Sequence, residues 1–178
     1  IDARGIHELA EALSQAADIY VFAPDSQRSA SGHGITVAKP VTAEEVKFEG
    51  AVFAAQMSGT PADRVKLGIK ILRDKGIKTD MVFSGINHGG NLGTDTLYSG
   101  TVSAAIEGNI CGVPAVAVSV NSHEPKNFEY ACDLALKTLE KVRGKISPDT
   151  VLNINVPDVP ADEVKGVKHT TLGNREYR

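Results

Sequence analysis

The sequence predicts an α/β domain built on a mostly parallel sheet. Segments with helical spacing of apolar residues alternate with short apolar runs, and this order is typical of βαβ units with right-handed crossovers. One of these runs, Ile19–Ala23, is continuously apolar, as in a parallel strand covered on both faces. The 178 residues suit a single domain that buries about 70% of its unfolded surface. Because the chain opens on a helix, we expect the first strand of the sheet to be missing.

The first third of the chain predicts a helix, a strand and a strand pair. Apolar residues recur at helical spacing, so residues 4–17 are expected to be helical. The strand at Ile19–Ala23 should stop at Pro24, before a polar loop over residues 25–34. Val46–Phe48 and Ala51–Met57 are expected to form a strand pair that turns at residues 49–50.

A helix start follows at Thr60, with Pro61 at its first position and Asp63 at its third. This combination predicts a capped helix that runs to about Lys75. The remaining elements are expected in alternation: a strand at Met81–Phe83, a helix at 102–108, a strand at 115–120, a helix at 127–143 and a strand at 151–156.

Composition excludes several classes of protein. The formal net charge of −3 argues against a broad nucleic-acid footprint, which needs clustered Lys and Arg. No apolar run approaches the roughly 20 residues of a membrane helix, and residues 1–10 carry charges throughout, unlike the apolar core of a signal peptide. Cys111 and Cys132 lack C-x-x-C spacing, so we expect reduced structural thiols in a cytoplasmic protein.

The segment Ser84–Thr101 is the strongest candidate site. It is rich in Gly, Asn and hydroxyl side chains, follows a strand and precedes a helix, which is where open α/β sheets bind ligands. Its last triplet, Ser99–Thr101, opens the helix, where free N–H groups favour a phosphate. The amides of Asn87 and Asn91 are suited to metal or phosphate. A plain connecting turn is the alternative interpretation.

Two further segments are weaker candidates. Arg28–Gly34 follows the strand 19–23 and should share the same sheet edge, although an ordinary solvated loop has the same composition. Ser58–Asp63 is already explained in part by helix capping. The chain has no G-x-G-x-x-G after a strand, no phosphate-binding G-x-x-x-x-G-K-[ST], no G-x-S-x-G and no H-E-x-x-H zinc motif.

Seven short blocks, taken in order, make the chain resemble one known family. They comprise residues 23–25, 28–30, 58–63, 84–87, 91–93, 98–102 and 152–157. Together they are similar to the SurE family, the stationary-phase survival proteins, over nearly the whole chain. The resemblance implies a Rossmann-like three-layer sandwich that hydrolyses nucleoside 5'- and 3'-monophosphates with a bound divalent metal, and a homodimer or tetramer in the intact protein.

The resemblance also implies the site residues. In this family two adjacent Asp residues, a Ser and an Asn hold the metal, and the last two correspond to Ser29 and Asn87. Since hard cations prefer oxygen ligands, Mg²⁺ or Mn²⁺ is expected. We assign the phosphate to Asn91 and to the helix start, and water orientation or acid–base catalysis to Asp95, for which a loop-bracing carboxylate is the alternative. The helix-start residues are Ser99, Gly100 and Thr101.

The chain departs from the family at both ends. The paired aspartates and their strand precede the position of Ile1, and a β-rich arm follows the last residue, so we expect residues 1–178 to be an impaired fragment of one domain. Asp2 is expected to cap the first helix. Two other classes stay open: a metal-independent phosphatase or esterase with Ser29 or Ser99 as nucleophile, and a non-catalytic nucleotide-binding module.

Overall fold

The computed structural model describes residues 1–24 and 32–174, which form two three-stranded sheets. In the first sheet β1 (Tyr20–Pro24) pairs in parallel with β3 (Phe53–Met57), and β3 pairs antiparallel with β2 (Ala43–Glu45). The second sheet is wholly parallel, in the order β4 (Val82–His88), β5 (Ala115–Val120) and β6 (Val151–Val156). Among the described strands, β2 is therefore the one that runs antiparallel to its sheet partner.

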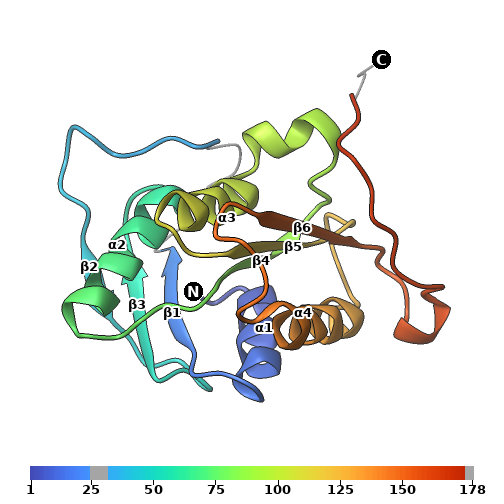
Figure 1. Cartoon of the computed structure of the whole chain (residues 1–178), viewed down its shortest axis with the longest axis horizontal. Coiled ribbons are helices and arrows are strands. Elements are labelled where there is room, and N and C mark those ends of the chain that lie inside the picture. Colours follow the sequence, from blue (N-terminus) through green and yellow to red (C-terminus); the bar gives the residue numbers. More distant parts are fainter. Residues whose placement is uncertain (25–31, 175–178) are drawn as a thin grey trace.

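Helices cover both faces of the sheets. The helices α1 (Arg4–Ser14) and α4 (Glu129–Val142) pack together on one face, and α2 (Pro61–Asp74) and α3 (Gly100–Ile110) on the other (Figure 1). Two short 3-10 helices, η1 (Gly93–Tyr98) and η2 (Ala161–Glu163), complete the order. The three layers confirm the predicted α/β fold with a mostly parallel sheet.

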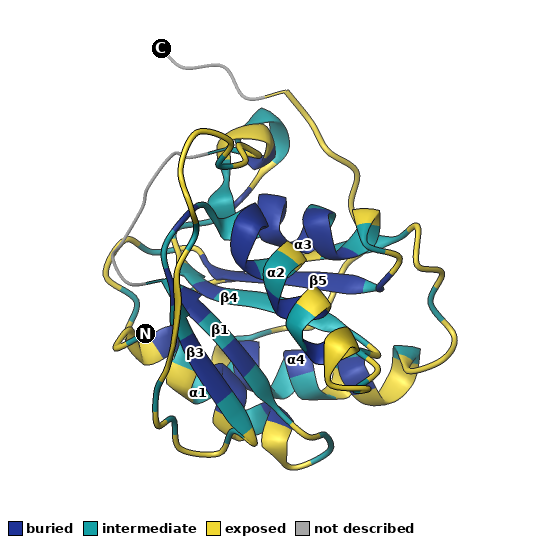
Figure 2. Cartoon of the chain, turned by 90° about the vertical axis from the view of Figure 1, so that its left-hand side faces the viewer, coloured by how far each residue is buried: buried dark blue, intermediate teal, exposed yellow. Residues whose placement is uncertain are grey.

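The core is built around β5, all of whose residues are buried (Figure 2). On one face Val116, Val118 and Val120 pack with Phe128 and with the apolar stripe of α1. On the other face, the small side chains of Ala115 and Ala117 in β5 pack against α3. Burial on both faces explains why this strand is apolar throughout apart from Ser119.

Most predicted elements are confirmed with shifts of a few residues, and β5 and β6 match their expected limits. The segment Ser84–Thr101 needs a correction, because its first five residues belong to β4 and not to a loop. The strand continues through Gly85, where a Cβ atom would lie 2.4 Å from the carbonyl oxygen of Val118. Only glycine permits this approach, and the register shifts here before pairing resumes at Asn87.

The predicted strand pair is also displaced. The partner of β3 is β2 at residues 43–45, whereas Val46 and Phe48, expected in the strand, pack against the core beside Ala10 and Val21. Phe48 stacks on His7 with ring centroids 4.3 Å apart, and the N–H of Val46 donates to the carbonyl of Ala54 in β3 at 3.0 Å. At the N-terminus, Ala3 and not Asp2 is the N-cap of α1, without a side-chain hydrogen bond.

A cavity of about 1640 Å³ separates the two sheets. Its walls include β1 and β4, each of which pairs with a single strand among the described residues. It reaches from the carboxyl ends of the strands to Thr79, whose buried hydroxyl has no hydrogen-bond partner in the described part of the chain. None of the helices in that part is long and apolar enough to cross a membrane.

Candidate functional site

The carboxyl ends of the strands bring the sequence-predicted segments together. The described part of the second segment, residues 32–34, lies beside the first, since the N–H of Gly32 donates to the carbonyl of Tyr98 at 3.3 Å. The N–H of Thr36 donates to Asp63 Oδ1 at 3.0 Å, which attaches the same stretch to the third segment. The three segments therefore form one edge, as expected from parallel strands.

Asn87 lies at this edge, one residue before the end of β4, and lines the cavity. Its side-chain Nδ2 donates to the carbonyl of Gly89 at 2.7 Å and to that of His88 at 3.2 Å. Both hydrogen bonds use the amide nitrogen, so the amide is held in one orientation. Oδ1, the oxygen that a metal would bind, accepts no hydrogen bond from a described residue.

Asn91 is buried, although it was predicted to contact phosphate. Its Nδ2 donates to Ser119 Oγ at 2.7 Å, and its main-chain N–H donates to Asn155 Oδ1 at 2.7 Å. Its carbonyl accepts hydrogen bonds from the side chains of Asn153 and Asn155. These contacts make Asn91 the residue that fixes the loop after β4 to β5 and β6; its contact with phosphate stays a prediction.

The start of α3 is the place where the sequence predicts phosphate binding. Ser99 is the N-cap, and its Oγ accepts a hydrogen bond from the N–H of Val102 at 3.1 Å. Gly100 and Thr101 follow in the first turn, where main-chain N–H groups have no partner within the helix. All three residues line the cavity, as does Asn87. The positive end of the helix dipole thus opens into the cavity that Asn87 also lines.

Two predicted site residues remain, Asp95 and Ser29. Asp95 lies in the first turn of η1 and lines the same cavity as Asn87 and Ser99. Ser29 lies outside the described residues.

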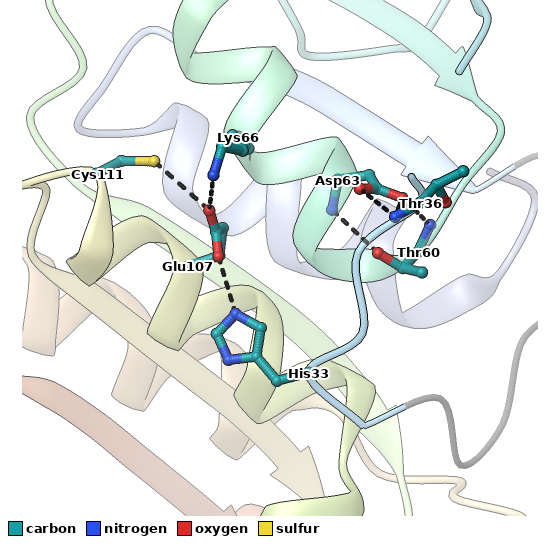
Figure 3. Close-up of polar contacts among 7 residues, drawn as sticks. All are labelled: His33, Thr36, Thr60, Asp63, Lys66, Glu107 and Cys111. Carbon is teal, nitrogen blue, oxygen red and sulfur yellow. Dashed lines mark hydrogen bonds and ion pairs between the residues drawn. The ribbon is translucent and has the colours of Figure 1, made fainter. Parts of the chain in front are cut away.

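The helix start at Asp63 confirms the predicted capping. Thr60 Oγ1 accepts a hydrogen bond from the N–H of Asp63 at 3.1 Å, and the Asp63 carboxylate accepts one from the N–H of Thr60 at 2.8 Å. The carboxylate also binds Thr36 (Figure 3). Burial alone would raise the pKa of Asp63, but the hydrogen bonds from Thr36 and Thr60 outweigh it and hold the pKa below its ordinary value.

Sequence reasoning missed two groups of residues at this edge. One is the set of amides on β6 that hold Asn91. The other is Glu107 of α3, a buried carboxylate that meets His33 at 2.8 Å and Lys66 at 3.3 Å. The alternation of Asn153 and Asn155 in an otherwise apolar strand was a usable signal for the first group. The second group had no local signal, since its members lie on three separate elements.

The two cysteines are free, as expected for reduced thiols. Burial, and then the charge of Glu107, raise the pKa of Cys111. Burial also raises the pKa of Cys132, to about 12. Both side chains are therefore thiols at neutral pH.

The described residues fit a divalent metal only in part. Asn87 offers a fixed amide oxygen, a ligand that hard cations accept. However, the described chain contains no group of three or more His, Cys, Asp or Glu side chains placed to hold a metal. A neutral oxygen alone does not bind such an ion firmly, so further carboxylates are required.

Fold and site together define a doubly wound, Rossmann-like α/β protein in which the first turn of α3 lines a cavity at the carboxyl edge of the sheet. The chain belongs to the family described as Survival protein SurE, whose family model matches residues 1–178.

Named relatives agree with this assignment. The chain is 49% identical to a 5'-nucleotidase SurE of Petrotoga mobilis, over 98% of this chain and 69% of the relative. It is 47% identical to a 5'-nucleotidase SurE of Synechococcus elongatus, over 98% of this chain and 68% of the relative. It therefore spans about two thirds of the length of these relatives.

A solved structure is similar as well. The crystal structure of the SurE protein from Aquifex aeolicus superposes with a TM-score of 0.86 at 39% sequence identity, covering 99% of this chain and 70% of that one. This similarity confirms the Rossmann-like fold class.

Proposed function

We propose that the chain is the α/β core of a divalent-metal-dependent phosphomonoesterase that acts on nucleoside 5'- and 3'-monophosphates. The observation that carries the proposal is the start of α3, which opens into the same cavity that the fixed amide of Asn87 lines. The relatives named 5'-nucleotidase SurE supply the nucleotide as substrate class. We expect the intact protein to be cytoplasmic and to form a homodimer or tetramer.

The large rate acceleration that phosphate monoester hydrolysis requires argues for a metal at this site. Enzymes accelerate phosphate monoester hydrolysis by up to about 10²¹-fold, whereas a helix dipole contributes only about 0.3 to 2 kcal/mol. The sequence has no phosphate-binding lysine of the P-loop type to add to it. A bound Mg²⁺ or Mn²⁺ supplies Lewis acidity and an acidified water when present.

Each residue has a proposed role. Asn87 and Ser29 bind the metal through their oxygens. The first turn of α3, Ser99–Thr101, binds the phosphate oxygens through main-chain N–H groups and hydroxyls. Asn91 contributes to this phosphate contact and holds the loop in place, and Asp95 orients the attacking water or transfers its proton.

We further propose that a strand preceding Ile1 in the longer protein fills the cavity and ends in paired aspartates. Three observations support this. β1 and β4 both line the cavity, and each has one strand partner among the described residues. The buried hydroxyl of Thr79 faces the same cavity without a hydrogen-bond partner in the described part of the chain. A carboxyl-terminal arm beyond residue 178 would complete the oligomer contacts.

The test compares the 178-residue chain with the same chain extended at its N-terminus by a strand ending in two aspartates. Both are assayed for phosphate release from AMP and from 3'-AMP with saturating Mn²⁺. We expect almost no activity from the short chain and clear activity from the extended one. An extended chain that is folded, as shown by its circular dichroism and a cooperative melt, but inactive on both nucleotides would overturn the site assignment.

A further inference from the structure

A buried carboxylate on α3 lies where three elements meet. Glu107 is 2% exposed, in the third turn of the helix. Its Oε2 lies 2.8 Å from Nε2 of His33, and its Oε1 lies 3.3 Å from Nζ of Lys66 on α2 (Figure 3). The thiol of Cys111 is 4.0 Å from the same Oε1. Burying a carboxylate is costly without such partners, so the cluster is a defined structure and not a chance surface contact.

The two partners of Glu107 do different things. Lys66 supplies a full positive charge from α2 and keeps 57% of its side chain exposed. It therefore neutralises the carboxylate whether or not His33 is present. His33 instead carries the segment 32–36 onto α3, because it is the one side chain of this segment that contacts Glu107.

The segment 32–36 is held at three points. At its start the N–H of Gly32 donates to the carbonyl of Tyr98, the residue that precedes the N-cap of α3. In the middle His33 meets Glu107. At its end the N–H of Thr36 donates to the Asp63 carboxylate, in the first turn of α2. The segment thus ties the residue before the N-cap of α3 to the first turn of α2.

We propose that His33 and Glu107 are positioning residues for the phosphate-binding turn of α3. Through Glu107, His33 fixes the segment 32–36 on α3, and Gly32 in turn holds Tyr98, so that Ser99–Thr101 is fixed before a phosphate arrives. The inference rests on the proposed function for its kinetic consequence. A displacement of about 1 Å in such a group can cost up to about 100-fold in kcat/KM, so a remote contact of this kind affects the site.

The kinetic test uses the extended chain with AMP and Mn²⁺. His33→Ala should raise KM about tenfold or more with kcat little changed, and it should lower the melting temperature without unfolding the chain, because the buried Glu107 keeps Lys66 as a partner. In His33→Gln the KM should return close to the parent value, since Nε2 of the glutamine can donate a hydrogen bond to the same carboxylate. Lys70→Ala, which removes an exposed ion pair one turn further along α2, is the control and should leave KM unchanged. An unchanged KM in His33→Ala would overturn the proposal.

A second readout needs no turnover. Hydrogen exchange of the main-chain amides of residues 32–36 and 99–103 is measured on the 178-residue chain, alone and with inorganic phosphate. His33→Ala should speed exchange in both segments and weaken the protection that phosphate gives to residues 99–103. Acceleration confined to residues 32–36 would make the cluster purely structural and overturn the proposal. An inactive extended chain with intact phosphate protection would instead count against the proposed function alone.

Discussion

The main-chain N–H of Asn91 donates a 2.7 Å hydrogen bond to Oδ1 of Asn155, a residue 64 positions further along the chain. Asn155 also returns a hydrogen bond from its own amide to the carbonyl of Asn91 at 3.2 Å. One side chain on β6 therefore satisfies both main-chain groups of one loop residue. This pairing holds the loop between β4 and η1, and with it the approach to the start of α3.

Asn155→Ala is expected to destabilise the fold by about 1–3 kcal/mol, because it leaves main-chain groups of the buried Asn91 short of partners. Urea unfolding followed by circular dichroism measures the change. The matched control is Asn174→Ala, at an exposed position, which should stay within about 0.5 kcal/mol of the parent chain. Equal stabilities for the two variants would contradict this account of the loop.

Replacing Asp63 should make the stability less dependent on pH. Burial raises the pKa of this carboxyl, but hydrogen bonds from Thr36 and Thr60 together lower it by more. The folded-state pKa therefore lies below the ordinary value of 3.8. A depressed pKa stabilises the fold above the ordinary value, and this contribution is lost as pH falls through the folded-state pKa.

Asp63→Ala is therefore expected to lose about 1 kcal/mol or more at pH 7, since it also removes the capping box of α2. The difference from the parent chain should shrink when melts are recorded near pH 3. The exposed Asp74→Ala is the control and should show a smaller loss. A difference that stays constant from pH 7 to pH 3 would disprove the linkage.

Gly5→Ala should destabilise the chain although alanine favours helices. A Cβ atom at this position of α1 would lie 2.5 Å from the carbonyl oxygen of Ile86 in β4, and a strand carbonyl cannot move aside. Overpacking of this kind costs about 1–3 kcal/mol. At Gly173 nothing lies within 4 Å of such an atom, so Gly173→Ala serves as the control. Thermal melts that rank the two variants equally would refute the close packing of α1 on β4.

Two substitutions of Ser99 distinguish its capping role from the proposed phosphate binding. Ser99→Ala removes the Oγ that accepts from Val102 and should cost about 0.5–2 kcal/mol of stability. Ser99→Asp keeps an N-cap oxygen but places a negative charge where the phosphate is proposed to bind. It should therefore melt near the parent temperature while the KM for AMP in the extended chain rises steeply. A Ser99→Asp variant with normal KM would exclude this turn as the phosphate site.

Sequence reasoning succeeded where the cause of a structure is local. The capping box at Thr60 and the buried strand 115–120 are encoded in neighbouring residues, and both are confirmed. It failed at Ser84–His88, because strand pairing across Gly85 depends on the close approach of Val118 from another element. Asp2 was also wrong as the cap of α1, since the helix begins after Ala3.

The kinds of residue at the candidate site were predictable from the sequence, but the contacts between them were not. Asn87 and the start of α3 follow from composition and from their place after a strand. The His33–Glu107 pair joins residues 74 positions apart, and no periodicity marks either partner. The burial of Asn91 depends on β6, a strand that the chain reaches only some sixty residues later.

Metal dependence is the central claim, and phosphate release from AMP by the extended chain tests it most directly. The rate is measured before chelation with EDTA, after it, and after excess Mn²⁺ is restored. The account predicts that release stops with the chelator and returns with the metal. An unchanged rate after chelation would contradict it and favour a serine nucleophile, whereas tight AMP binding without any release would identify a non-catalytic nucleotide-binding module.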